Sequence, residues 1–163
     1  MITQVKWQSG SSLNGLFLSR LEVEWNVTLP GDFKSVVLDN NYAYPLPNVF
    51  DTEKSKGRVF AGLLNFNLQD KSNAIKDYLA IKSRLPIKVY PFAEDPSGNF
   101  ICFDFATPKP TVIFWNHEGR IVNGKDTYDV EFVADSFTDL LSKLYVSPFS
   151  KQDIDLSDFE VLP

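Results

Sequence analysis

The chain has 163 residues, a formal net charge of −5 and 44% hydrophobic residues, among them 14 phenylalanines. A chain of this length folds as one domain and buries roughly 70% of the surface that it exposes when unfolded, so its core needs no disulfide or structural metal. No apolar run approaches the roughly 18 residues of a membrane span, the N-terminal residues lack a secretory signal pattern, and Cys102 is the only cysteine. We therefore expect a single cytoplasmic domain.

Charge is distributed unevenly along the sequence. Residues 1–92 carry 11 Lys and Arg against 8 Asp and Glu, whereas residues 93–163 carry 5 against 13, a balance of −8. Phosphate binding depends on clustered Lys and Arg, so nucleic acid is a poor direct partner for the second half. A basic protein surface would be steered toward it, and the alternative is a solvated acidic surface that only aids solubility.

Apolar spacing predicts two helices in the first forty residues. From Ser12 onward a large apolar residue recurs every four positions as far as Trp25. Pro30 suits the start of a second, short helix because a first helical turn does not need its missing N–H, and the run 39–41 ends that helix. Residues 42–56 contain prolines and a polar run and are expected to form a loop.

Strand and helix signals follow each other in the middle of the chain. Residues 58–64 predict a strand, with Gly62 marking a bulge or a close approach. A helix follows from about Asp70, which can cap it, until Pro86 stops it. Further strands are expected at 87–92, 100–105, 111–115 and 128–133, and the apolar character of 100–105 on both sides is typical of a central strand.

The last helix has the clearest signal in the sequence. Asp135 or Ser136 caps it, and its apolar residues follow the spacing of a buried stripe: Phe137, Leu140, Leu141, Leu144 and Tyr145. Beyond it the tail is acidic with interleaved apolar residues, a composition that suits docking. The expected organisation is therefore one domain over residues 1–163, with its core at about 12–146 and an acidic C-terminal tail at 147–163.

Residue types that carry catalysis are isolated from one another. His117 is the only histidine, so it cannot build a His-based metal cluster, and no nucleophile or orienting group accompanies it. Cys102 lies among apolar residues of a predicted central strand, where burial raises the pKa of a thiol and makes it a small core residue. Residues 95–99 lack the acidic spacing of a calcium loop and predict a tight turn. We expect no enzyme activity, no cofactor and no metal.

Asp104 interrupts a hydrophobic strand and leaves one alternative open. A buried carboxylate is costly unless it is paired or hydrogen-bonded. A structural hydrogen bond to a loop or to the end of the strand is the favoured interpretation. The alternative is a ligand-binding or enzymatic site in which Asp104, Trp115 and His117 converge, and a surface position of His117 far from Asp104 would count against it.

Four segments, taken in order, are similar to one protein family. They are Leu29–Phe33 at a helix start, Pro91–Asp104 through a turn and a strand, Val112–Glu118 at a strand end, and Val133–Leu141 at a helix start. Over about residues 18–145 their order and spacing resemble the SUKH superfamily of Smi/Knr-like domains. One departure is Asp39–Pro45, which stands where many members carry an Asn-Gly-Gly turn, although Asn40 and Asn41 tolerate positive φ.

The resemblance implies an α+β fold with a mixed or antiparallel sheet and helices packed on one side. It also implies a non-enzymatic role, because bacterial members are largely regarded as immunity proteins that neutralise toxin domains of polymorphic toxin systems. Fungal relatives are regulatory scaffolds in cell-wall signalling, which is the alternative function. The expected partner is a cognate toxin domain, foremost a basic nuclease, and the oligomeric state stays open.

If the chain binds such a toxin, we expect the contacts in its C-terminal half. Exposed acids of predicted turns would face the basic partner, with one tryptophan beside them, and ordinary solvated loop acids are the alternative. The expected partner-binding residues are Trp115, Glu118, Asp126, Asp129 and Glu131.

Overall fold

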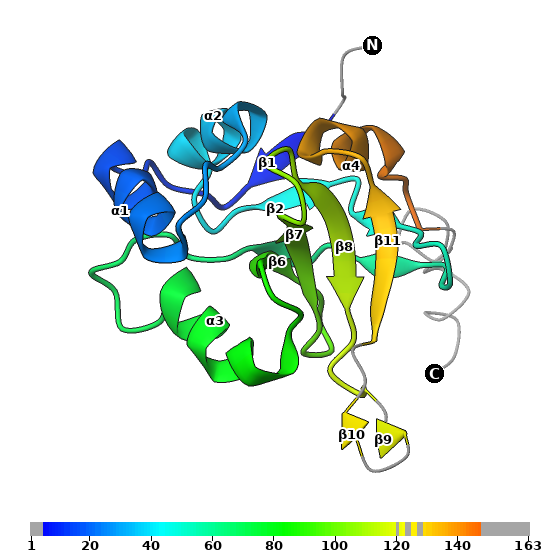
Figure 1. Cartoon of the computed structure of the whole chain (residues 1–163). Helices are drawn as coiled ribbons and strands as arrows, with labels where there is room; N and C mark the ends of the chain where they lie inside the picture. The colour runs from blue at the N-terminus through cyan, green and yellow to red at the C-terminus, as the bar shows by residue number, and fades with distance from the viewer. Residues whose placement is uncertain (1–4, 120, 123–124, 127–128, 148–163) are drawn as a thin grey trace, which may run out of the picture.

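A computed structural model describes residues 5–119, 121–122, 125–126 and 129–147. Within these residues the chain forms an α+β domain around a five-stranded sheet in which every neighbouring pair is antiparallel (Figure 1). The strand order is β11-β8-β7-β6-β5. The bounds are β5 (Gly62–Leu63), β6 (Val89–Glu94), β7 (Phe100–Asp104), β8 (Thr111–Trp115) and β11 (Val130–Ala134). The predicted fold class is confirmed.

All helices predicted from the sequence are present, and none in the described part of the chain has the length and apolar character needed to cross a membrane. The first begins slightly later than expected, since Asn14 caps it, and Asn73 rather than Asp70 caps the third. Ser136 caps the last, as predicted. The bounds are α1 (Gly15–Trp25), α2 (Gly31–Asp39), α3 (Ala74–Ile81) with the 3-10 turn η1 (Lys82–Arg84), and α4 (Phe137–Lys143).

Short antiparallel ribbons surround the sheet, and two strands lie in the segment expected to be a loop. The pairs are β1 (Lys6–Gln8) with β2 (Tyr44–Leu46), β3 (Val49–Phe50) with β4 (Arg58–Val59), and β9 (Ile121–Val122) with β10 (Lys125–Asp126). The single strand expected at 58–64 is divided into β4 and β5. The division arises because Phe60 donates its N–H to Asn48 whereas Ala61 donates to Glu94, so neighbouring residues change partners.

Positive φ in the 39–45 turn falls on Tyr42, at 65°, and not on Asn40 or Asn41. Both asparagine side chains are committed to hydrogen bonds instead. Asn40 Nδ2 donates to the carbonyl of Val36, and the buried Asn41 accepts from the N–H of Phe66 at 2.8 Å. Tyr42, and neither asparagine, therefore takes the left-handed conformation in this turn.

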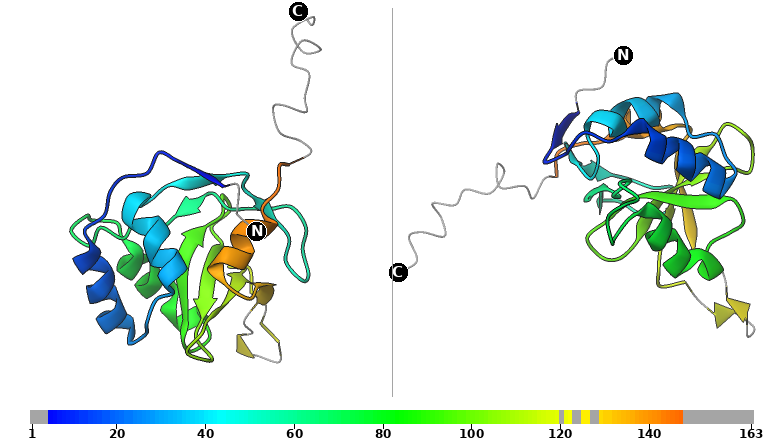
Figure 2. Two further views of the ribbon diagram at one scale, coloured as in Figure 1. Left: turned by 90° about the horizontal axis from the view of Figure 1, so that it is seen from above. Right: turned by 90° about the vertical axis from the view of Figure 1, so that its left-hand side faces the viewer.

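Side chains alternate between two cores across the sheet. The larger core, on the face covered by α1, α2 and α4, takes Ile101, Phe103, Val112 and Phe114. The opposite face carries a smaller core made of Leu85, Val89, Cys102, Ile113 and Trp115. Helix α3 straddles the sheet, because Ala74 belongs to the larger core while Ile81 packs on the smaller one (Figure 2). Helices α1, α2 and α4 therefore pack on one side of the sheet, as expected. The α3–η1 segment covers the other face.

Phe33 of α2 lies at the centre of the larger core with none of its surface exposed. Its ring meets four other phenylalanines edge to face, with centroid separations from 5.2 to 5.6 Å: Phe66, Phe92, Phe103 and Phe137. Such pairs add about 0.5–1.5 kcal/mol each beyond the burial of apolar area.

Replacing Phe33 by alanine is expected to lower the free energy of unfolding by about 3–5 kcal/mol, because it leaves a cavity where four rings meet. Urea unfolding followed by circular dichroism measures this loss. The matched control is Phe132→Ala in β11, whose side chain is 37% exposed and which should cost less than about 1 kcal/mol. Equal losses for the two variants would contradict the central role of Phe33.

Candidate functional site

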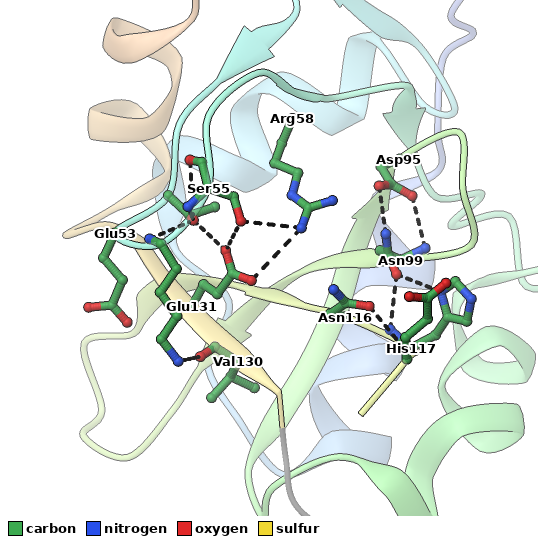
Figure 3. A network of polar contacts seen from close by, with 12 residues as sticks. Glu53, Ser55, Arg58, Asp95, Asn99, Asn116, His117, Val130 and Glu131 are labelled. Atoms are coloured by element: carbon green, nitrogen blue, oxygen red, sulfur yellow. Dashed lines mark hydrogen bonds and ion pairs between the residues drawn. The ribbon is translucent and has the colours of Figure 1, made fainter. Parts of the chain in front are cut away.

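Two polar clusters, one at the end of β6, β7 and β8 and one beside β11, are drawn together in Figure 3. The first, here called the Asn99 cluster, consists of Asp95, Asn99, Asn116 and His117. The second, here called the Glu131 cluster, consists of Thr52, Ser55, Arg58 and Glu131. Each joins segments that are distant in the sequence, and each has a buried residue at its centre.

Asn99 is 3% exposed and holds the turn after β6 against the turn after β8. Its Nδ2 donates to Asp95 Oδ2 at 2.9 Å, which fixes the orientation of the amide because a carboxylate only accepts. Its Oδ1 then accepts from the backbone N–H of His117 at 2.9 Å and lies 2.6 Å from His117 Nδ1. Nδ1 is therefore the protonated ring nitrogen, and Asn99 sets the tautomer and the direction of the imidazole.

Four more contacts fasten the chain where it leaves β8. Arg84 donates to the carbonyl of His117, and its guanidinium lies over the ring of Trp115, 5.2 Å from the centroid. Asn116 Oδ1 accepts from the N–H of Glu118 at 2.9 Å. The N–H of Asn116 in turn donates to the carbonyl of Asp129 at 2.9 Å. The turn is thus held to η1, to Asp129 just before β11, and to the turn after β6.

The structure brings three of the five expected partner-binding residues to this end of the sheet. Glu118 is exposed on the turn, and Asp129, which is partly exposed, lies opposite Asn116. Asp126 belongs to β10, which extends beyond the sheet at the same end (Figure 1), and its side chain lies outside the described part of the structure.

Trp115 and Glu131 lie inside the protein, with only 2% and 4% of their surface exposed. The expectation that Glu131 is an exposed turn acid is wrong, because the residue lies within β11 and its carboxylate turns toward Arg58. Trp115 shares the smaller core with Cys102, since alternate residues of β8 face opposite sides of the sheet. Neither side chain is placed to contact a partner directly.

Glu131 fastens the segment before β4 onto the edge of the sheet. Its Oε1 accepts from the hydroxyls of Thr52 and of Ser55, the latter at 2.7 Å. Its Oε2 lies 3.9 Å from the guanidinium of Arg58, which also covers the ring of Phe114 at 4.6 Å from the centroid. A buried carboxylate is tolerable here because hydroxyls and a cation replace the water that it loses.

Residues 51–57 also cover the outer edge of β11. The N–H of Glu53 donates to the carbonyl of Phe132 at 2.9 Å, and Glu53 Oε1 accepts from the N–H of Phe132 at 3.0 Å. Lys54 Nζ reaches the carbonyl of Val130 at 3.4 Å. An uncovered strand edge invites pairing with other chains, so this segment protects the edge.

Replacing Glu131 by alanine is expected to lower the free energy of unfolding by about 2–3 kcal/mol, because two hydroxyls and one guanidinium lose their shared acceptor. Amide exchange at Phe132 should accelerate at the same time, since the covering segment is released. Urea unfolding and hydrogen–deuterium exchange measure the two effects. Glu118→Ala, at an exposed acid, is the control and should change stability by less than about 0.5 kcal/mol. Unchanged exchange at Phe132 would refute the clamp.

The alternative site around Asp104, Trp115 and His117 does not form. The β7–β8 register pairs Asp104 with Thr111 and Phe100 with Trp115, which places Asp104 and Trp115 at opposite ends of the strands. Asp104 Oδ1 accepts from the N–H of Ala106 at 2.9 Å, which is the structural hydrogen bond favoured from the sequence.

Cys102 behaves as the small core residue that the sequence predicts. It is fully buried, and burial, followed by the negative charge of Asp104, raises the pKa of its thiol well above the ordinary value. Within the described residues, no group of three or more His, Cys, Asp or Glu side chains is arranged to hold a metal ion.

Asp77 on α3 and Glu94 on β6 are two half-buried carboxyl groups whose pKa values are raised. Burial raises the pKa of Asp77. Burial also raises the pKa of Glu94, and the charges of Asp77 and Asp95 add to this effect. Because the folded state holds these protons more tightly than the unfolded chain, both groups reduce stability as the pH rises above the unfolded pKa and through the folded pKa.

Glu94→Gln is therefore expected to raise the free energy of unfolding at pH 7, by less than about 1 kcal/mol because solvent screens a half-buried group. Near pH 3 the difference should vanish, since both states then bind the proton. Urea unfolding across this pH range checks the sign, with Glu24→Gln on exposed α1 as the control. A stabilisation that persists unchanged at pH 3 would exclude the electrostatic cause.

Comparison with known families fits this arrangement of strands and helices. A family model described as SUKH_6, SMI1-KNR4 cell-wall, matches residues 17–141, from within α1 to within α4. The chain therefore belongs to the SUKH superfamily, in its SUKH_6, SMI1-KNR4 family. Members of this family are generally non-catalytic. No curated protein gives a significant match to the chain.

Proposed function

We propose that this chain is a cytoplasmic, non-enzymatic immunity protein that binds and neutralises a cognate toxin domain, a basic nuclease, of a polymorphic toxin system. The observation that carries the proposal is the family match over residues 17–141, because the bacterial members that the sequence resembles have this role. The excess of acidic residues in the second half of the chain is compatible with a basic partner.

The turn held by the Asn99 cluster is the proposed contact surface. It carries Glu118, and Asp126 and Asp129 belong to the same end of the sheet. A partner that meets a fixed turn loses less conformational entropy than one that must order a loop, so the cluster contributes to affinity without touching the partner. Carboxylates placed there would cover the phosphate-binding surface of a nuclease and accelerate the encounter.

Trp115 takes part indirectly in this proposal. It lies beneath the turn, and Arg84 stacks on its ring while donating to the carbonyl of His117. Glu131 likewise acts from within, by holding residues 51–57 on the neighbouring edge of β11. Both residues support the surface and neither is proposed to contact the toxin.

A regulatory scaffold without a toxin partner is the second candidate function. The words cell-wall in the description of the matched family are compatible with it. The gene beside the one for this chain discriminates the two: a long secreted protein with a variable C-terminal domain supports immunity, and its absence supports the scaffold.

Co-expression with the C-terminal domain encoded by the neighbouring gene tests the proposal. The two proteins should purify together, and the chain should restore growth of cells that produce the domain. At low salt, Glu118→Lys with Asp129→Lys should slow association by about tenfold or more, because both charges face the partner.

The matched control reverses two exposed acids elsewhere, Glu24→Lys with Asp39→Lys, and should leave the association rate within about twofold after correction for net charge. Failure to bind the domain or to protect the cells would refute the proposal. Equal slowing by both double variants would show that the contact does not lie at the turn.

A further inference from the structure

An open groove of about 1060 Å³ lies between the C-terminal end of α1, the α3–η1 segment and the adjoining ends of β6 and β7. Aromatic rings form its floor: Trp25, Tyr78, Tyr90 and Phe105. The ring of Tyr90 stacks on that of Trp25 at 4.8 Å and lies 4.9 Å from that of Tyr78. Both tyrosines are partly buried, and burial raises the pKa of each hydroxyl.

Two large aliphatic side chains stand uncovered among the lining residues. Val23 on α1 is 81% exposed and Ile87 is 88% exposed. Isolated surface aliphatics are ordinary, but these two flank the aromatic floor and continue it outward. The groove thus combines aromatic rings with two exposed aliphatic side chains.

The free charge along the groove is positive. Lys82 and Lys88 line it, and within the described residues neither ammonium group has an ion-pair partner. The carboxylate among the lining residues, Glu22, is already engaged by Lys34 at 3.2 Å and by the N–H of Leu29 at 2.7 Å. Two free cations beside an apolar floor select an occupant that combines carboxylates with apolar side chains.

Lys88 also has an unusual backbone. Its φ is 64°, in the left-handed region that costs a residue with a Cβ roughly 1–2 kcal/mol. Glycine would adopt this conformation without the cost, yet the position carries a lysine whose side chain is exposed at the groove. The turn at Lys88 therefore places an exposed ammonium group at the groove.

The sequence of this chain contains a segment with the required chemistry. Residues 153–161 read Asp-Ile-Asp-Leu-Ser-Asp-Phe-Glu-Val, with acids and apolar residues interleaved and no Lys or Arg among them. Elsewhere the acidic second half of the chain would repel such a segment, whereas the groove presents cations. Charge complementarity therefore matches the groove to this segment.

The position of Ser147, the last residue described before this segment, decides which copy provides it. Tyr145, just after α4, is bound to Val49. Helix α4 lies beside β11, away from α1 and α3 (Figure 1). From residue 147 to residue 159 an extended chain spans at most about 43 Å. A domain of this length is roughly 40 Å across, and a route around its surface is longer than that. The groove of a second copy has no such restriction.

We propose that the segment 148–163 of one copy docks in the groove of a second copy, with its apolar side chains on the aromatic floor and its carboxylates at Lys82 and Lys88. The contact is head to tail, because each copy offers one groove and one acidic segment. It does not rest on the immunity function, since it uses neither the turn at Glu118 nor a toxin.

Analytical ultracentrifugation of the full chain at about 0.05–1 mM tests the proposal, since a small charged contact is expected to have micromolar affinity. The average mass should rise with concentration and fall when salt is added. Deletion of 148–163, or Lys82→Glu with Lys88→Glu, should give a monomer throughout. The control Lys71→Glu with Lys76→Glu, at exposed lysines outside the groove, should associate like the full chain.

Complementation makes the test specific. The deletion variant keeps its groove and the Lys82→Glu, Lys88→Glu variant keeps its acidic segment, so an equimolar mixture should form a 1:1 complex although each is a monomer alone. A full chain that stays monomeric at 1 mM, association that survives both changes, or a mixture without complex would each overturn the proposal.

A labelled peptide of residues 152–163 provides the second readout. It should bind the deletion variant, and Ile87→Asp should weaken binding by about tenfold or more through lost apolar contact and added repulsion. Leu79→Asp is the matched control, because Leu79 is 60% exposed on α3 but does not line the groove. Absence of peptide binding, or equal loss in the two variants, would refute the groove. Peptide binding together with a monomeric full chain would assign the groove to the chain's own segment and overturn docking between copies.

Discussion

The packing around Phe33 is the constraint on which the rest of the structure depends. One side chain of α2 reaches rings contributed by β6, β7, α4 and the segment before α3, so these elements are fixed relative to one another by a single buried residue. The neighbouring Asp32 extends the same junction to the surface, where its carboxylate accepts from the N–H and hydroxyl of Thr138. This packing covers the face of the sheet that carries the larger core. The polar turns and the groove lie at the ends of the strands.

Elements whose signal is local could be predicted from the sequence. The stripe from Phe137 predicts α4 because helical periodicity needs no knowledge of the partner, and residues 95–99 predict a turn because Asp95 bonds groups two and four positions ahead. The break between β4 and β5 was not predictable, since it depends on which distant strand each residue meets. That the second face of the sheet is also covered could be predicted from the sequence, because Cys102 and Ile113 make their strands apolar on both sides.

The candidate site likewise contains residues whose positions could be predicted from the sequence and residues whose positions could not. Glu118 and Asp129 were expected among the exposed acids, and they lie at the same end of the sheet because β8 and β11 are neighbours. The position of Glu131 was beyond sequence reasoning, since its hydroxyl partners are 76 and 79 residues away and no local pattern links them. Trp115 could have been placed correctly: in a strand, side chains two apart share a face, so Trp115 follows Ile113 inward.

The two proposed contact surfaces occupy opposite ends of the same pair of strands. Tyr90 and Phe105, at the groove, lie near the start of β6 and the end of β7, whereas Asn99 lies in the turn that joins the other ends. Six residues of β6 separate them by roughly 20 Å. The groove carries free ammonium groups and the turn carries carboxylates, so each end selects a partner of opposite charge. A copy held through its groove would still present the Glu118 turn, so the proposed self-association and the proposed toxin binding would not compete.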